Sequence, residues 1–188
     1  PQGSFSKSLQ VYATGSVALS SVLLEPSERF RELIQTSWIV GLDVVPADPD
    51  LKLVDVELSQ QGGRELRLRR CLSRYLPVGY AFVLIDCPPS LDLLTTNALV
   101  AASDLVIPVD GGSFGMEALN DTLESIQAVR QSLRYDLSIL GIVLSNVNLR
   151  TTYDQTAEET LRQRFGSLIF KTIIPNSIRV DEASQMGR

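Results

Sequence analysis

From about residue 38 onward, short apolar runs rich in β-strand residues alternate with segments of helical periodicity. Most of these runs are continuously apolar, which is typical of strands that are covered on both faces of a parallel sheet. The alternation predicts an α/β fold with a mainly parallel, doubly wound sheet and helices on both faces. The strand candidates are Gly41–Val45, Tyr80–Asp86, Asp104–Val109, Leu137–Ser145 and Phe170–Ile174.

Two of the intervening segments have the pattern of amphipathic helices. Apolar residues recur at helical spacing over Leu119–Leu133 and again over Tyr153–Phe165. Thr151 and Thr152 are suited to begin the second helix, and Gly166 is suited to close it. These features predict two helices that alternate with the last three strands.

Ligands of open parallel sheets bind beyond the carboxyl ends of the strands. Polar groups are therefore expected along one edge of this sheet, where a nucleotide would lie. The residues at the predicted strand ends are Asp86, Asp110, Asn146, Asn148, Pro175 and Asn176.

The composition is that of a globular protein, with 188 residues, 44% of them hydrophobic and 21% charged. One domain over residues 1–188 in the cytoplasm is expected, because the sequence shows neither a membrane-spanning run nor a signal-peptide pattern. The absence of histidine excludes Ser/His/Asp and Cys/His catalysis. Cys71 and Cys87 lack metal-site spacing and are expected to be reduced and structural.

Charge limits the ways in which the chain can contact nucleic acid. The formal net charge is −5, which argues against coating nucleic acid through bulk charge and leaves a local patch as the alternative. Arginine supplies 14 of the 17 basic residues, and part of it clusters over Arg64–Arg74. For that cluster a solvated helix face is favoured over a binding site.

The most distinctive local string is FVLIDCPPS, an apolar run that ends in Asp86 and is followed by a Pro-Pro break. A carboxylate in this position can hold Mg²⁺, usually through water, while the ion bridges phosphate oxygens. Many α/β strands end in Asp, so a capping or structural role is the alternative for an isolated motif of this kind.

The longer string DCPPSLDLLTTNALVAASD resembles the ParA and Soj branch of the deviant Walker ATPases, in the MinD/ParA superfamily. Further segments are similar to motifs of that family and follow the family's order along almost the whole chain. They are PQGS, GLDVVPADPDLKLVDVEL, VIPVDGGSFGMEAL, GIVLSNVNLRTTYDQ and FKTIIPNSIRVDEA.

One family element is absent from the sequence. No GxxxxGK[ST] or KGGVGKT string occurs, and the GGSFG segment lacks the lysine that such a loop requires. The family places this loop before the motif that PQGS resembles, and members of the family continue beyond the segment that matches the MGR ending. The resemblance therefore implies a single ATPase domain that is truncated at both ends, and residues 1–188 alone are expected to be inactive.

The resemblance implies a P-loop ATPase that binds ATP and Mg²⁺ and forms a homodimer with ATP. Such a protein would bind DNA of the nucleoid without sequence preference and would act in chromosome or plasmid partition. A ParB-type centromere-binding protein would stimulate its ATP hydrolysis. No membrane partner is expected.

Four residues of the carboxylate motif take roles from the resemblance. Asp86 corresponds to the Mg²⁺-linked catalytic carboxylate. Pro88, Pro89 and Ser90 correspond to the loop beside the γ-phosphate, although ordinary turn residues would look the same. Gln2 corresponds to a switch residue near the attacking water, but the aspartate that precedes it in the family is missing.

The remaining roles fall on the second half of the chain. Asn146, Pro175 and Ser177 match the adenine-contacting loops, with capping of strand ends as the alternative. Arg150 and Arg179 match arginines implicated in dimer and DNA contacts, with ordinary surface arginines as the alternative.

Several substitutions depart from the family pattern, Ser4 for Asn and the Gln185–Met186 ending among them. Asp92 replaces Gly, Asn148 replaces Asp, and Asn176 stands where the family has Arg. The last change removes a potential phosphate contact, so the resemblance supports nucleotide binding more firmly than DNA binding.

Two other functions stay open at this point. A MinD-like, membrane-associated division-site ATPase would share the fold but would need a C-terminal amphipathic helix. A non-catalytic interaction module of the same ancestry would lack the phosphate-binding loop.

Overall fold

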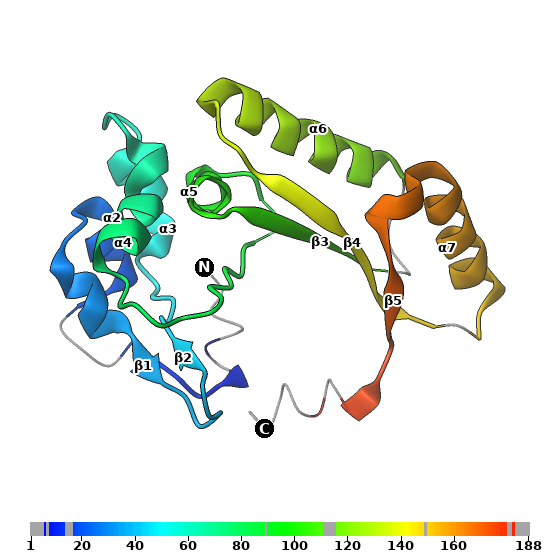
Figure 1. Ribbon diagram of the computed structural model, residues 1–188, viewed down its shortest axis with the longest axis horizontal. Helices are drawn as coiled ribbons and strands as arrows, with labels where there is room; N and C mark the ends of the chain where they lie inside the picture. Colours follow the sequence, from blue (N-terminus) through cyan, green and yellow to red (C-terminus); the bar gives the residue numbers. More distant parts are fainter. Residues whose placement is uncertain are drawn as a thin grey trace. The chain divides into compact units, whose positions relative to one another are not determined.

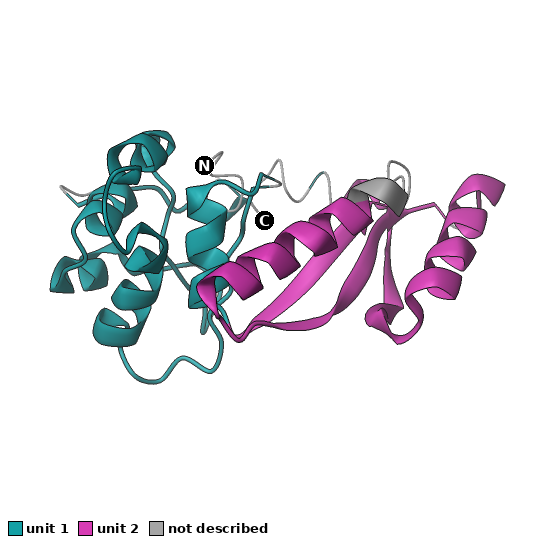
Figure 2. Cartoon of the chain, turned by 90° about the horizontal axis from the view of Figure 1, so that it is seen from above, with its two compact units in different colours: residues 1–102, 182–188 teal, residues 103–181 magenta. Residues whose placement is uncertain are grey.

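The computed structural model describes residues 6, 8–13, 17–88, 90–110, 116–148, 150–179 and 182, with the side chains of residues 116–118 left out. The chain divides into two compact units, as Figure 2 shows. Unit 1 comprises residues 1–102 and 182–188, and unit 2 comprises residues 103–181. The single domain expected over residues 1–188 stays a prediction.

Unit 1 is mainly helical in its described part. Helix α2 contacts both α3 and α4, and helix α5 also contacts α3 and α4. The two strands β1 and β2 form a short antiparallel ladder. The elements are α2 (Leu19–Leu24), η1 (Glu28–Leu33), β1 (Gln35–Thr36), β2 (Asp43–Val44), α3 (Leu51–Leu58), η2 (Arg64–Leu66), α4 (Arg67–Tyr75) and α5 (Leu93–Ala101), labelled in part in Figure 1.

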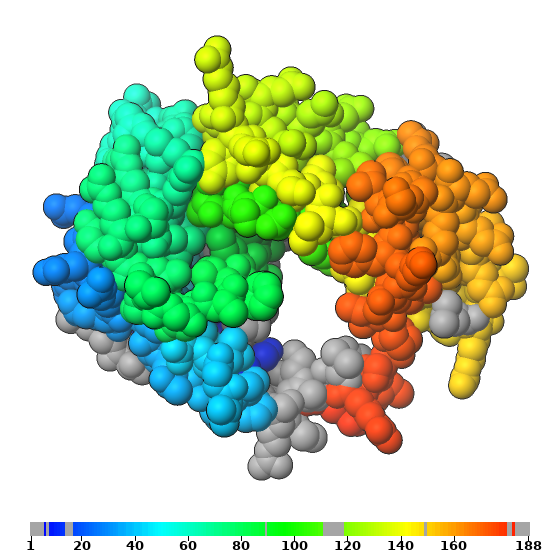
Figure 3. Space-filling view, in the orientation of Figure 1, coloured from blue at the N-terminus to red at the C-terminus, as the bar shows by residue number. Residues whose placement is uncertain are grey.

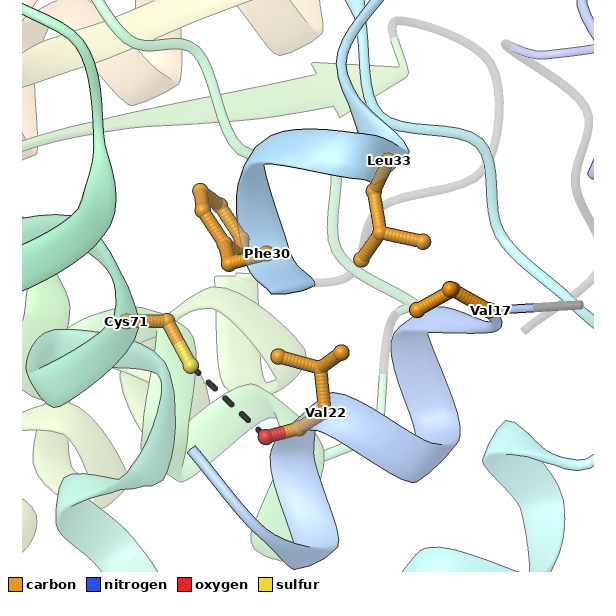
Figure 4. Packing of buried hydrophobic residues seen from close by; sticks show 5 residues of the cluster. All are labelled: Val17, Val22, Phe30, Leu33 and Cys71. Carbon is orange, nitrogen blue, oxygen red and sulfur yellow. Dashed lines mark hydrogen bonds between the residues drawn. The ribbon is translucent and has the colours of Figure 1, made fainter. Parts of the chain in front are cut away.

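A hydrophobic cluster joins α2, η1 and α4, and Figure 4 shows its members in contact. The cluster consists of Val17, Val22, Phe30, Leu33 and Cys71. The Cys71 thiol is fully buried and donates a weak hydrogen bond to the Val22 carbonyl at 3.8 Å. The structural role predicted for this cysteine is confirmed, because a free buried thiol packs as a small hydrophobic group.

Asn97 fixes the start of α4 against α5. Its side chain is buried, and its Oδ1 accepts a hydrogen bond from the backbone N–H of Leu68 at 3.1 Å. Its Nδ2 donates to the carbonyls of Arg64 and Leu93 at 2.9 and 3.0 Å. A buried amide with these partners is fully engaged, so it holds the two helices in one relative position.

Unit 2 contains the parallel sheet that the sequence predicts. Its strands are hydrogen-bonded in the order β3-β4-β5, both pairs are parallel, and a helix connects each pair. The three last predicted strands and both predicted helices are thereby confirmed. The elements are β3 (Asp104–Asp110), α6 (Met116–Leu133), β4 (Ser138–Val147), α7 (Thr152–Phe165), η3 (Gly166–Leu168) and β5 (Ile169–Pro175), as Figure 1 shows.

The predicted ends of α7 are also confirmed. The Thr151 hydroxyl accepts a hydrogen bond from the backbone N–H of Asp154 at 3.3 Å, which caps the first turn. Gly166 ends the helix with φ 53° and ψ −121°, a conformation that residues with a β-carbon rarely adopt. Leu161 is buried, as the apolar stripe predicted.

Two strand predictions were wrong in detail. Within Gly41–Val45 only Asp43–Val44 is a strand, and it pairs antiparallel with β1 instead of joining the parallel sheet. Residues Tyr80–Asp86 are extended but form no strand. The Tyr80 hydroxyl donates a hydrogen bond to the Asp43 carboxylate of β2 at 2.6 Å. No described strand pairs with this segment, and Tyr80, Phe82, Val83 and Leu84 are exposed at the surface of unit 1, drawn in green in Figure 3.

Among the helices in the described ranges, none is both long enough and apolar enough to span a lipid bilayer.

Candidate functional site

A row of hydrogen-bonded polar side chains joins the carboxyl ends of the three strands of unit 2. Asn146, near the end of β4, donates from Nδ2 to Oδ2 of Asp110, the last residue of β3, at 3.1 Å. Asn176, which follows β5, donates from Nδ2 to Oδ1 of Asn146 at 2.5 Å. The backbone N–H of Asn176 also donates to the Val147 carbonyl at 3.0 Å. The polar edge predicted from the sequence is therefore confirmed in unit 2.

The position of Asn146 depends on an uncommon backbone conformation. Its φ of 55° lies in the left-handed region, which asparagine adopts more readily than most residues. This conformation places the amide across the strand ends, where it donates to one neighbour and accepts from the other. The residue that the resemblance assigns to adenine therefore also ties β4 to both neighbouring strands, and the adenine contact stays a prediction.

The loop that follows β4 is held by Asp154 and Asn148. Asp154 is buried in the first turn of α7, and its Oδ2 accepts from the backbone N–H of Asn148 at 2.7 Å. The Asn148 side chain in turn accepts from the backbone N–H of Arg150 at 3.2 Å. These bonds fix the backbone beside Arg150 while its side chain stays exposed.

The loop after β5 carries the other residues predicted for unit 2. Pro175 is the last residue of β5 and lies opposite Val147 of β4, next to Asn146. Ser177 is half-buried, and Arg179 is exposed. The structure thus brings Pro175 to the polar edge and leaves both predicted DNA-binding arginines at the surface.

Asp86 lies in the extended segment of unit 1. It is exposed, and its carboxylate accepts no hydrogen bond from any residue of the described ranges. Carboxylate oxygens suit Mg²⁺, which binds through one or two carboxylates together with waters and phosphates. The single exposed carboxylate of Asp86 suits that mode of binding. Within the described ranges there is no group of three His, Cys, Asp or Glu residues that could hold a metal ion.

The next residues form the start of α5. Oδ1 of Asp92 accepts from the backbone N–H of Thr95 at 2.9 Å, and its Oδ2 accepts from the Ser90 hydroxyl at 2.7 Å. Burial acts to raise the pKa of Asp92, but these hydrogen bonds outweigh it and hold the pKa below its ordinary value. The substitution of Asp for Gly thus supplies a helix cap. Sequence reasoning missed this role, although an Asp before an apolar helical run is a recognised start signal.

The structure gives no information on two predicted site residues. Gln2 and Pro89 lie outside the described residues. Pro88 is described and half-buried, between Asp86 and the start of α5.

Known proteins are similar to this chain over most or all of its length. A family model described as an AAA domain matches residues 1–139. The chromosome partitioning protein ParA of Caulobacter vibrioides is 37% identical over 190 residues, which cover 100% of this chain and 71% of that protein. The sporulation initiation inhibitor protein Soj of Bacillus subtilis is 36% identical over 157 residues, which cover 84% of this chain and 62% of that protein.

Solved structures share the fold. Cobyrinic acid a,c-diamide synthase from Mycobacterium smegmatis, with bound ATP analog and magnesium, matches with a TM-score of 0.85 and 28% identity over 100% of this chain and 77% of that one. An ATP complex of Cyanothece McdA matches with a TM-score of 0.84 and 21% identity, over 100% and 73% of the two chains. These matches confirm the predicted α/β class, with a mainly parallel sheet and helices on both faces.

Proposed function

This chain belongs to the ParA/Soj-type ATPase family, and from that premise we propose that it acts in the ATP-dependent segregation of DNA. The observation that carries the proposal is the hydrogen-bonded row of Asp110, Asn146 and Asn176 at the carboxyl ends of three parallel strands. Nucleotides bind at this edge of open parallel sheets. Its carboxylate and amide groups include both donors and acceptors of hydrogen bonds, and recognition of a nucleotide base requires both.

Asp86 is the residue that we assign to Mg²⁺. Its carboxylate is exposed and unengaged within the described ranges, so it is free to hold a hydrated ion. Magnesium, when bound, neutralises charge on the phosphate oxygens of ATP. Asp86 would orient the water shell of the ion, and Ser90 would contribute a hydroxyl beside it.

The finer parts of the function follow from family membership. We propose that ATP binding brings two copies of the protein together, and that the dimer binds DNA of the nucleoid with little base preference. Arg150 and Arg179 are exposed and follow different strands, so a dimer would double the number of guanidinium groups available to phosphates. A ParB-type partner would then stimulate hydrolysis.

The sequence leaves open a second candidate, a non-catalytic module of the same fold that lacks the lysine of a GxxxxGK[ST] loop. Phosphoryl transfer depends on positioning and on neutralisation of charge, and the lysine of this loop is a main source of both. A module of this kind could still dimerise or bind DNA without turnover.

The test is Mg²⁺-dependent ATP hydrolysis by the full-length gene product that contains this sequence. Asp86→Ala should reduce the rate by at least about 100-fold, the scale reported for loss of one preorganised electrostatic contact. Asp121→Ala removes an exposed carboxylate from α6 and should leave the rate unchanged. Absence of hydrolysis in the unmodified protein would favour the non-catalytic module, and hydrolysis that survives Asp86→Ala would show that the ion is bound elsewhere.

A further inference from the structure

Unit 1 contains a cavity of about 400 Å³ whose lining is dominated by arginine. This volume falls within the range of about 300 to 1,000 Å³ that is typical of small-molecule sites. The lining residues are Glu25, Pro26, Arg67, Arg70, Arg74 and Tyr75.

The three arginines share one face of α4. Arg67, Arg70 and Arg74 are spaced three and four residues apart, and residues at that spacing are neighbours on a helix surface. Cys71, on another face of the helix, is buried in the cluster with Val22 and Phe30. Because that packing sets the rotation of α4, the arginine face is directed into the cavity.

Arg67 is held in place at the inner end of this face. Its Nη1 donates to the Leu24 carbonyl at 3.2 Å, and its Nη2 donates to Oε1 of Gln61 at 2.7 Å. Its Nε is buried and has no hydrogen-bond partner within the described ranges. A buried donor of this kind is costly to leave unpaired. An anion in the cavity would offer it an acceptor.

Arg70 and Arg74 are less engaged than Arg67. Neither side chain makes an ion pair or hydrogen bond with the part of the chain that the structure describes. The Arg70 guanidinium lies over Gly63, where a β-carbon would be only 2.9 Å from Nη2. Glu25 is the one carboxylate in the lining, and no ion pair joins it to these arginines in the described residues. Three positive charges therefore face one negative charge.

We propose that this cavity binds a phosphate group. Guanidinium groups form paired, charge-assisted hydrogen bonds with phosphate oxygens, and several of them close together suit a compact, multiply charged anion. The phosphate could belong to a free phosphate ester or to the backbone of a nucleic acid. The proposal does not depend on the proposed partition function, because it rests on α4 and not on Asp86 or the polar edge of unit 2.

The test is a calorimetric titration of the full-length gene product with inorganic pyrophosphate. Arg70→Ala and Arg74→Ala should each weaken binding by about tenfold or more, the scale of one lost charged hydrogen bond. Arg70→Lys should fall between the unmodified protein and Arg70→Ala, since lysine keeps the charge and loses the paired geometry. Arg69→Ala, which removes the same charge from α4 outside the cavity lining, should bind as the unmodified protein does.

Competition then identifies the source of the phosphate. A short DNA duplex that displaces pyrophosphate from the unmodified protein supports the nucleic acid backbone, and a duplex that does not displace it supports a free phosphate ester. Equal losses in Arg69→Ala and Arg70→Ala, or citrate binding as tightly as pyrophosphate, would overturn the proposal. The titration is run without Mg²⁺, which the proposed nucleotide site requires, so a failure here is distinguishable from a failure of the proposed function.

Discussion

The ring of Phe170 in β5 lies against the α-carbon of Gly141 in β4, in the space that a side chain at position 141 would need. A β-carbon on Gly141 would be 2.3 Å from Cε1 of Phe170 and 2.8 Å from the Leu168 carbonyl oxygen. Contacts this short cannot be relieved by rotating a flexible side chain end. The pairing of these two strands therefore requires glycine at this position.

Gly141→Ala should lower the free energy of unfolding by about 1 to 3 kcal/mol, the usual cost of overpacking. The measurement is urea denaturation followed by circular dichroism. Gly62→Ala is the control, because a β-carbon there would meet nothing within 4 Å. Unfolding midpoints that agree for both variants would show that β4 and β5 can shift apart at little cost.

Residues 78–84 expose a group of apolar side chains. Phe82 is 84% exposed, Leu84 is 88% exposed, and no described strand pairs with their segment. β3 and β5 are edge strands of the described sheet, and unpaired edges associate with other chains. We expect residues 1–188 to self-associate as their concentration rises, which light scattering would detect.

The double variant Phe82→Ser, Leu84→Ser should reduce this self-association. The matched control is Leu53→Ser, Val56→Ser, which removes two exposed apolar side chains from α3. A monodisperse monomer at all concentrations would contradict the predicted self-association. Equal effects of both double variants would show that the exposed apolar side chains of residues 78–84 are not its cause.

Asp55 in α3 carries a charge in an unfavourable place. Its Oδ1 is buried without a hydrogen-bond partner in the described residues. Burial and the nearby charge of Asp92 raise the pKa of Asp55. The folded state therefore holds the Asp55 proton more tightly than the unfolded chain does, so ionised Asp55 destabilises the fold at neutral pH.

Asp55→Asn should raise the free energy of unfolding at pH 7 by up to about 1 kcal/mol, the scale of interactions between partly exposed charges. The gain should shrink as the pH falls through the raised pKa and should vanish below the unfolded value of about 3.9, where Asp55 is protonated in both states. Glu57→Gln, on the exposed side of α3, should give no comparable gain. Urea denaturation at several pH values separates the two, and a gain that is independent of pH would contradict this explanation.

Arg179 should contribute to DNA affinity without reading sequence. Arg179→Ala in the full-length gene product should weaken ATP-dependent DNA binding equally on two unrelated duplexes and should reduce the salt slope by about one. Nucleotide binding should survive. Lys171→Ala removes an exposed charge from β5 and serves as the control. DNA binding that is equal with and without ATP, or that is unaffected by Arg179→Ala, would place the DNA surface elsewhere.

The elements that the sequence predicted well are those whose signals are local. β3, β4 and β5 follow from continuous apolar runs, and α7 follows from its stripe together with Thr151 and Gly166. The two wrong strand predictions concern segments whose state depends on a partner. An apolar run such as Tyr80–Asp86 becomes a strand only where another strand satisfies its backbone groups.

The candidate site was predictable in part for the same reason. Strand ends located Asp110 and Asn146 at one edge, because parallel strands end together. The bond between them depends on the register that aligns Asp110 with Ser145, which no local pattern specifies. Asn176 was expected at the same edge, as well as being a departure from a family arginine, but its bond to Asn146 emerges only from the folded chain.

The contrasting environments of the two cysteines make the natural sequence suitable for site-selective labelling. Cys71 is fully buried, and burial raises the pKa of its thiol to about 11, so it presents almost no thiolate to a reagent. Cys87 as a residue is exposed. Partial burial of its thiol, together with the nearby charges of Asp86 and Asp92, raises the pKa of this thiol as well. Because the chain has only these two cysteines, a maleimide dye would attach beside Asp86 without any engineered residue. Its emission would then report in real time on the arrival of a ligand at the carboxylate.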